Sequence, residues 1–290
     1  MYYKIFCDAA CDIDVDVVKN YDLNIFQMEY TCGYERLQSD GVDTPESLIK
    51  LYNTQKNGDV TKTFQIEKSV YVETFEKFVV HGIGVLYIAL SSGLTPSYNT
   101  AVSAKKLLER KYNKKLPIYV IDSKSASGGI ALLVERALDN QRRNVDIDVN
   151  YRDIIDVVND VRVDFFVDSL NYLYAGGRLS RASAFIGTLL KVKPLLKVNL
   201  DGELEQLAKV NGDKNVLNGL FDIYSKNHKS SFINSVYIAH ADNAICAEKL
   251  KVKINSLTPD VKVKVKLMTL IISAHVGPGS VILSYCGTKN

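Results

Sequence analysis

Short apolar stretches alternate with amphipathic stretches through the first half of the sequence, and this alternation restricts the possible folds more than any other feature. The predicted strands are YKIF (3–6), LNIFQME (23–29), GVLYIAL (84–90) and PIYVID (117–122). The predicted helices cover residues 14–19, 45–55, 69–79 and 96–112. The second of these helices starts at Thr44-Pro45, which suits an N-cap and a first helical residue. The alternation favours a mostly parallel sheet with helices on its faces.

The pattern changes beyond about residue 150. Residues 193–210 predict a β-hairpin, with Asp201-Gly202 at its turn. Further elements are a helix over 214–227, a strand over 235–240, a helix over 244–257 and strands around VKVKVKL and SVILSYC. In VKVKVK (261–266) lysine alternates with valine, as in a half-exposed strand near a sheet edge. We therefore predict two domains, an α/β domain over 1–160 with a parallel sheet and an α+β domain over 161–290.

Composition and charge narrow the class of protein. The chain has 290 residues, of which 47% are apolar and 24% charged, and this balance is typical of a soluble globular protein. A net charge of +3 is too small to indicate binding to nucleic acid or to an anionic membrane. Five cysteines without a CxxC pair suggest neither a zinc site nor a disulfide framework. We expect a cytoplasmic protein, since no signal peptide or membrane span is evident.

The common enzyme signatures are absent from the sequence. It contains neither G-x-S-x-G nor GxxxxGK[ST], and GIG (82–84) precedes a strand instead of following one. The four histidines form no HExxH arrangement, so we expect no metal site. What remains is a set of turns with hydroxyl groups, glycines and one histidine. In an open α/β sheet, ligands bind beyond the carboxyl ends of the strands, where such turns meet.

These turns make the sequence similar to a known family. Asp8 near the start is followed in order by TFQ (63–65), SSGLT (91–95), VIDSKSAS (120–127), GGRLS (176–180) with GTLLKVKPLLKV (187–198), AHADN (239–243) and SAHVGPG (273–279). Together they resemble the DegV family of bacterial fatty-acid-binding proteins, which includes the acyl-carrying subunits of fatty acid kinase. The resemblance implies an α/β domain beside an α+β domain, with one fatty acid, such as palmitate, in a tunnel between them. It implies no other cofactor.

The resemblance also implies where the carboxylate of the fatty acid binds. The matching positions are Thr63, Thr95 and His275. Threonine hydroxyls can donate to a carboxylate, and Thr95 stands before a predicted helix start, where free N–H groups favour an anion. Secondary candidates are Ser91, Ser92, Arg178 and Gly277.

Each candidate has a structural alternative that the sequence leaves open. Thr95 fits a helix N-cap, Thr63 a strand end and His275 a core histidine bonded to backbone, between a strand and Gly-Pro-Gly. Arg178 suits a phosphate or an acidic partner, and equally an exposed position beside a helix-ending glycine pair. Ser91 and Ser92 could simply satisfy the backbone of their turn.

Some positions depart from the family pattern. Phe64 and Ile66 replace Ser and Pro of T-S-Q-P-S, and Ala9 and Ala10 replace two hydroxyl residues after Asp8. Asn211 and Asp213 stand where members that work with the kinase commonly carry arginine. These two residues argue against a kinase partner more than against lipid binding.

These observations leave three candidate functions for the protein. The first is a non-enzymatic carrier of a long-chain fatty acid. The second is the same carrier presenting its ligand to a separate kinase, which would supply the nucleotide site that this chain lacks. The third is an acyl hydrolase or transferase that uses a Ser or Thr nucleophile with His275.

Overall fold

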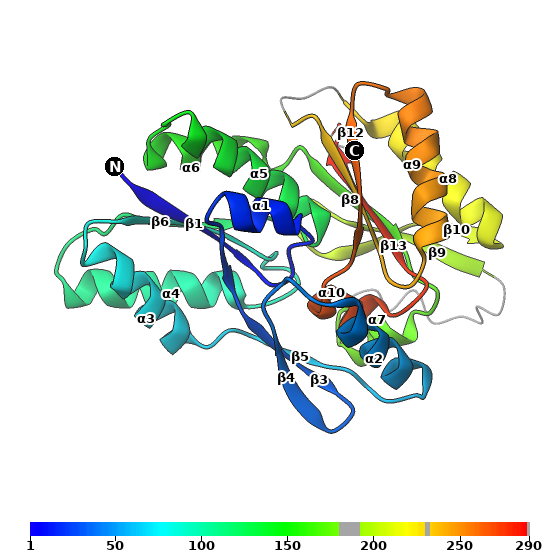
Figure 1. The fold of residues 1–290 in the computed structure, drawn as a ribbon, viewed down its shortest axis with the longest axis horizontal. Coiled ribbons are helices and arrows are strands. Elements are labelled where there is room, and N and C mark those ends of the chain that lie inside the picture. Colours follow the sequence, from blue (N-terminus) through cyan, green and yellow to red (C-terminus); the bar gives the residue numbers. More distant parts are fainter. Residues whose placement is uncertain (180–191, 230–232, 289–290) are drawn as a thin grey trace.

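The computed structural model describes residues 1–179, 192–229 and 233–288. A four-stranded sheet in the order β2-β1-β6-β7 forms the first half. Its strands are β1 (Tyr3–Asp8), β2 (Asn24–Phe26), β6 (Gly84–Ala89) and β7 (Ile118–Asp122), and all neighbours are parallel. Helices α3 (Lys68–Val79) and α4 (Ser97–Lys111) pack on it, as do α5 (Gly128–Arg142) and α6 (Ile147–Val158) (Figure 1). This confirms the predicted parallel sheet.

A second, six-stranded sheet has the order β10-β9-β8-β13-β11-β12. Its strands are β8 (Val161–Phe166), β9 (Val192–Val198), β10 (Leu204–Asn211), β11 (Ser235–His240), β12 (Lys262–Leu267) and β13 (Val281–Cys286). Only the β11–β12 pair is parallel, and the other pairs are antiparallel. Helices α8 (Asp213–Asn227) and α9 (Ala244–Leu257) cover its outer face in Figure 1. The predicted hairpin and the edge position of the lysine-rich strand are confirmed.

A small third sheet joins the two halves at one end of the molecule. It consists of β3 (Met28–Cys32), β4 (Glu35–Ser39) and the two-residue β5 (Thr63–Phe64), all antiparallel. Next to it lie α2 (Pro45–Lys56), α7 (Asn171–Ala175) and α10 (Leu270–Val276) (Figure 1). Short helix α1 (Val15–Asn20) follows β1. As predicted, Thr44 caps α2, since its hydroxyl accepts from the N–H of Ser47.

Helix α5 packs against both large sheets. It contacts β1 and β6 on one side and β8, β11 and β13 on the other. Two glycines at its start allow the close approach: a Cβ on Gly128 would lie 2.4 Å from the Cβ of Tyr237, and one on Gly129 would lie 2.6 Å from Cγ2 of Val163. The sequence reading assigned neither this helix nor β8.

Two predicted elements are wrong. LNIFQME is two strands, because the chain bends at exposed Gln27 and passes from the parallel sheet into the small sheet. Phe26 and Met28 on either side of the bend are both buried, so the apolar alternation continues unbroken across it. The stretch before Gly-Pro-Gly is not a strand but helix α10, and His275 lies on it.

The two halves are joined by a cluster of charged side chains. Asp14, just before α1, pairs with Lys264 at 3.2 Å and with Lys266 at 3.1 Å on β12. Lys264 also pairs with Glu135 of α5. The lysines of the edge strand are therefore partly engaged within the molecule. The predicted division at residue 160 remains a prediction.

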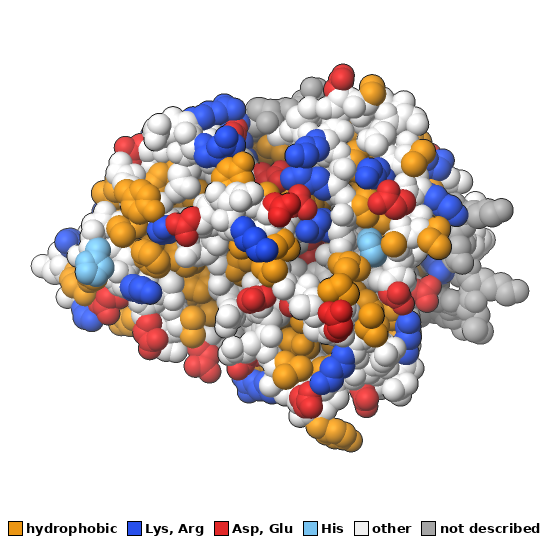
Figure 2. All heavy atoms as spheres, viewed as in Figure 1, with side chains coloured by type: hydrophobic (Ala, Val, Ile, Leu, Met, Phe, Trp, Pro, Cys, Tyr) orange, Lys and Arg blue, Asp and Glu red, His pale blue; other side chains and the backbone are white. Residues whose placement is uncertain are grey.

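Charged side chains of both signs are interspersed over the face of the molecule in Figure 2. Among the described residues, no helix combines the length and the apolar character needed to cross a membrane.

The buried carboxyl group of Asp164 on β8 allows a test of the environment in the core of the second sheet. Its carboxylate accepts from the hydroxyl of Tyr285 at 2.7 Å, and burial raises its pKa to about 6. A carboxyl group whose pKa is higher in the folded than in the unfolded chain stabilises the fold at low pH, and this contribution is lost as the pH rises through the folded value.

We therefore expect Asp164→Asn to become more stable relative to wild type between pH 4 and pH 7, by about 1–3 kcal/mol. Urea unfolding of both proteins across this range measures the difference. A difference that does not change with pH would contradict the assignment of a raised pKa to this group.

Candidate functional site

An apolar pocket lies between the two large sheets, beside the small sheet. It encloses about 680 Å³ between its lining atoms, part of it open to solvent. Its walls come from both halves of the chain and are mostly aliphatic or aromatic, including Met28, Leu90, Leu94, Phe165, Leu204 and Ile271. This apolar character is typical of pockets for small apolar ligands. Five lining residues carry polar side chains, namely Thr63, Gln65, Thr95, Arg178 and His275.

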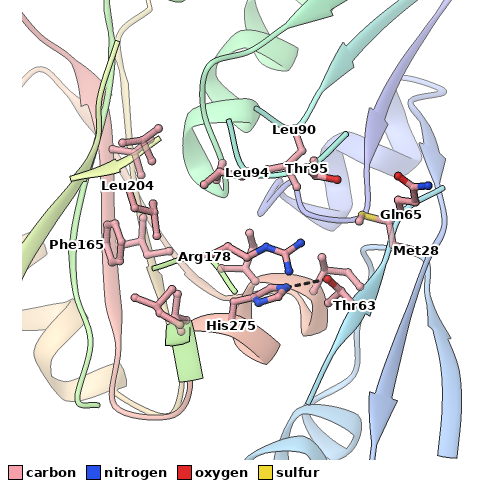
Figure 3. A pocket seen from close by; sticks show the side chains of 18 of the residues that line it. Met28, Thr63, Gln65, Leu90, Leu94, Thr95, Phe165, Arg178, Leu204 and His275 are labelled. Atoms are coloured by element: carbon pink, nitrogen blue, oxygen red, sulfur yellow. Dashed lines mark hydrogen bonds between the residues drawn. The ribbon is translucent and has the colours of Figure 1, made fainter. Parts of the chain in front are cut away.

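Thr63 and His275 form a direct hydrogen bond within the pocket. The Thr63 hydroxyl lies 2.7 Å from Nε2 of His275, and Figure 3 shows the bond at the centre of the polar group. Thr63 is on β5 and His275 is on α10, so the pair joins residues that are 212 positions apart in the chain. Nδ1 of His275 is buried without a hydrogen-bond partner among the described residues. Gly176 is closely packed against it, since a Cβ there would lie 2.2 Å from Nδ1.

The imidazole of His275 is uncharged at neutral pH. Burial, together with a smaller effect of the positive charge of Arg178, lowers its pKa to about 3. Arg178 points toward the Thr63–His275 pair in Figure 3 and is only half-buried, although burial lowers its own pKa too. Its guanidinium donates to the carbonyl of Gly176 at 2.5 Å. The sequence analysis left open a fully exposed position for Arg178, and this alternative is wrong. The glycine pair beside it does end helix α7, as that alternative expected.

Thr95 reaches the pocket from the loop after β6. It is 6% exposed, and its hydroxyl lies 3.1 Å from that of Ser97. Helix α4 begins at Ser97 with Pro96 at the N-cap position, so Thr95 does not take the N-cap position that the sequence suggested. Its hydroxyl still accepts a long bond of 3.4 Å from the N–H of Ser97. The three residues that the family resemblance implied for the carboxylate thus line one pocket.

The tip of the β9–β10 hairpin rests on the SSGL turn. The Ser91 hydroxyl donates to the carbonyl of Gly202 at 2.7 Å, and a Cβ on Gly93 would lie 2.5 Å from the same oxygen. Lys124 donates to the carbonyl of Asp201 at 3.3 Å and pairs with Asp122 at 3.1 Å. These contacts hold in place the hairpin that carries the pocket residues Val198 and Leu204.

The other secondary candidates lie outside the pocket lining. Ser91 serves the hairpin contact, and both the N–H and the hydroxyl of Ser92 donate to Asp122. Gly277 ends α10 at a φ of 71° against the ring of Tyr172. Asn211 ends β10 and is exposed, whereas the Asp213 side chain and Ser180 of GGRLS lie outside the part of the chain that the structure describes.

From the sequence, Arg178 was only a secondary candidate, and the apolar residues that line the pocket were not identified. Arg178 belongs to a motif that the sequence analysis quoted, but nothing in its neighbours shows that α7 turns it toward the pocket. Leu204 and Phe165 lie on strands of the second sheet, and only the topology brings them opposite Leu90. Within the described ranges, no group of His, Cys, Asp or Glu side chains could hold a metal ion.

Fold and pocket together define an α/β protein with two large sheets and, between them, a mostly apolar pocket that has a few polar side chains in its wall. The family model described as "Uncharacterised protein, DegV family" matches residues 3–287. The chain therefore belongs to the DegV family. It is 32% identical over 286 residues to a DegV domain-containing protein of Clostridium perfringens, covering 98% of this chain and 97% of the relative.

Other similar proteins carry names that refer to lipids. A fatty acid-binding protein of Thermotoga maritima is 28% identical over 288 residues, covering 97% of this chain and 96% of its own. The crystal structure of a DegV lipid-binding protein from the same organism superposes with a TM-score of 0.81 at 26% identity, over 100% of both chains. The fatty acid kinase B3 protein of Streptococcus pneumoniae, loaded with linoleic acid, has a TM-score of 0.83 at 20% identity and covers 99% of both chains.

The hairpin contact can be tested with two glycines that differ mainly in their surroundings. Gly202 has a φ of 80°, and a Cβ there would lie 2.0 Å from the Ser91 hydroxyl. Gly33 in the β3–β4 turn has a φ of 61° with open space around it.

We expect Gly33→Ala to cost about 1 kcal/mol of stability from backbone strain alone, and Gly202→Ala to cost about 1–3 kcal/mol more. Chemical denaturation measures both. Hydrogen exchange should accelerate over residues 199–204 in Gly202→Ala only. Equal costs with no local change in exchange would show that the hairpin tip is not held against Ser91.

Proposed function

We propose that this chain binds one long-chain fatty acid, with the acyl chain in the apolar pocket and the carboxylate at Thr63, Thr95 and His275. The observation that supports it most is that these three side chains line the same mostly apolar pocket, in which Thr63 and His275 are hydrogen-bonded to each other. The relatives named for fatty acid or lipid binding share the fold over nearly the full chain. Palmitate is a suitable example of the ligand.

The energetics favour such a ligand. Burial of a 16-carbon chain contributes on the order of 11 kcal/mol before the costs of ordering, at about 0.8 kcal/mol per methylene group. The carboxylate then needs only a few hydrogen bonds to fix its orientation. Arg178 supplies a positive charge beside the Thr63–His275 pair, which favours an anion there. Hydroxyl donors from Thr63 and Thr95 complete the proposed head-group site.

The same geometry does not favour a hydrolase. A threonine hydroxyl 2.7 Å from a histidine resembles a nucleophile with its base. However, a base with a pKa of about 3 is poorly matched to proton abstraction at neutral pH. Within the described residues, moreover, no carboxylate orients Nδ1 of His275. These features support a carrier, and we propose no catalytic step.

Replacing both threonines tests the proposed head-group site. We expect Thr63→Val with Thr95→Val to lower fatty acid affinity by about 10- to 100-fold, since two hydrogen bonds to a charged group are lost while shape is kept. Thr100→Val is the matched control, because the Thr100 hydroxyl donates to the carbonyl of Pro96 and Thr100 is not among the described residues that line the pocket.

Native mass spectrometry of the purified proteins, followed by solvent extraction, measures the bound acid. We expect about one fatty acid per chain in wild type and Thr100→Val. Undiminished occupancy in the double variant would refute the head-group assignment. A wild-type protein that is empty and takes up no added fatty acid would refute the proposed function itself.

A second candidate adds a partner kinase that phosphorylates the bound carboxylate. It is favoured by the shared fold with the Streptococcus pneumoniae fatty acid kinase B3 protein and by the position of Arg178, which can bind phosphate oxygens. The sequence departures at Asn211 and Asp213 argue against it.

Incubation of the loaded protein with ATP and a lysate of the host, followed by hydroxylamine, should convert an acyl phosphate to a hydroxamate. We expect Arg178→Gln to lower the yield at least tenfold at equal lipid occupancy, and Arg152→Gln on the exposed face of α6 to leave it unchanged. No hydroxamate with loaded wild type would count against a kinase partner.

A further inference from the structure

The Thr63–His275 hydrogen bond joins two very short elements from opposite halves of the chain. Strand β5 has only two residues, and helix α10 has seven. Elements of this length have few contacts of their own with which to fix the distance between them. A binding site needs its polar groups held to within a fraction of an ångström, and supporting side chains supply that precision. The support for this pair must therefore come from neighbouring elements.

The side-chain amide of Gln55 on α2 lies between these two elements. Its Nε2 donates to the carbonyls of Ser273 and Ala274 in α10, at 3.1 and 3.2 Å, and to the hydroxyl of Thr61 at 3.1 Å. The two carbonyls can only accept, so the nitrogen of the amide must face them. Gln55 is 2% exposed and Thr61 is 4% exposed. One buried amide thus joins helix α10 to the segment that leads into β5.

The hydroxyl of Thr61 strengthens this link. It donates to the carbonyl of Ala274 at 2.7 Å, the same carbonyl that accepts from Gln55. Ala274 directly precedes His275, and Thr61 stands two positions before Thr63. The two side chains therefore fix both partners of the head-group hydrogen bond through their neighbours in the sequence.

The amide of Gln55 is not needed to satisfy the backbone that it contacts. The carbonyl of Ser273 also accepts from the N–H of Gly277 at 3.0 Å, and that of Ala274 accepts from Thr61. The amide oxygen of Gln55 is itself buried without a hydrogen-bond partner among the described residues. Such an atom costs stability. A purely stabilising role explains this amide poorly, and its removal should leave the fold intact.

We propose that Gln55 and Thr61 are positioning residues for the head-group site, and that they hold α10 and β5 at the separation at which Thr63 and His275 together receive a carboxylate. Neither is among the described residues that line the pocket, so both act through that pair. The inference rests on the proposed function and extends the site to residues that do not touch the ligand.

Gln55→Met tests this role, because methionine keeps the length of the side chain and removes the N–H donors. We expect its affinity for dodecanoate, below the critical micelle concentration, to fall about 3- to 10-fold in calorimetric titrations. Before ligand is added, the ring-nitrogen NMR resonances of His275 should move toward those seen in Thr63→Val, which removes the hydrogen bond directly. The resonances missing from His275→Asn identify them among the four histidines.

Asn150→Leu is the matched control, since it removes another buried amide that links two elements. The Asn150 amide donates to the hydroxyl of Tyr3 and to the carbonyl of Ala137, and neither residue is among the described ones that line the pocket. This variant should keep the wild-type affinity and the wild-type resonances of His275, whatever it costs in stability.

Thr61→Val replaces the test if Gln55→Met does not fold, and Thr61→Ser, which keeps the hydroxyl, should then retain wild-type binding. Wild-type affinity or unchanged His275 resonances in the tested variant overturn this inference alone, as does an equal loss of affinity in Asn150→Leu. A wild-type protein that binds no fatty acid overturns the proposed function, whereas the resonances of the ligand-free proteins still test the link.

Discussion

The architecture depends on one helix that serves two sheets. Helix α5 can contact the six-stranded sheet only because Gly128 and Gly129 carry no side chain, and any larger residue would meet Tyr237 or Val163. Ser127 just before it, at a φ of 56°, donates to Asp12, which in turn accepts from the N–H of Thr269 ahead of α10. The turn after β1, the start of α5 and the start of α10 are thereby fixed together. The pocket forms where these segments leave space between the sheets.

The chemistry of the pocket follows from its position at this junction. The first half of the chain supplies hydroxyl groups from Thr63 on β5 and from Thr95 in the loop after β6, whereas the second half supplies apolar strand faces, an arginine and a histidine. Because these groups are buried, the pKa of His275 is lowered and the pKa of Asp8 is raised. Among the described residues that line the pocket, Arg178 carries the one charged side chain, and Thr63 and Thr95 supply hydroxyl groups.

Much of the fold and part of the site could be predicted from the sequence, for reasons that particular residues make clear. The Asp201-Gly202 turn and Thr44-Pro45 act locally, and local chemistry is readable from neighbours. The bend at Gln27 was missed because Phe26 and Met28 are buried in different sheets without disturbing the apolar alternation. Helix α10 resembles a buried strand, since nearly every residue in it is enclosed. The resemblance to a family supplied Thr63, Thr95 and His275, whereas the orientation of Arg178 depends on tertiary structure alone.

The position of β13 has a consequence for how the chain acquires its structure. This strand is the last in the sequence, yet it lies in the interior of the six-stranded sheet, between β8 and β11. Val161 of β8 pairs with Cys286, so the registry of the sheet is completed only by residues near the C-terminus. Contacts of such long sequence separation slow folding, because much of the chain must be ordered before they form. On the ribosome, the parallel sheet can assemble early, whereas the second sheet must wait until the segment that forms β13 has been synthesised.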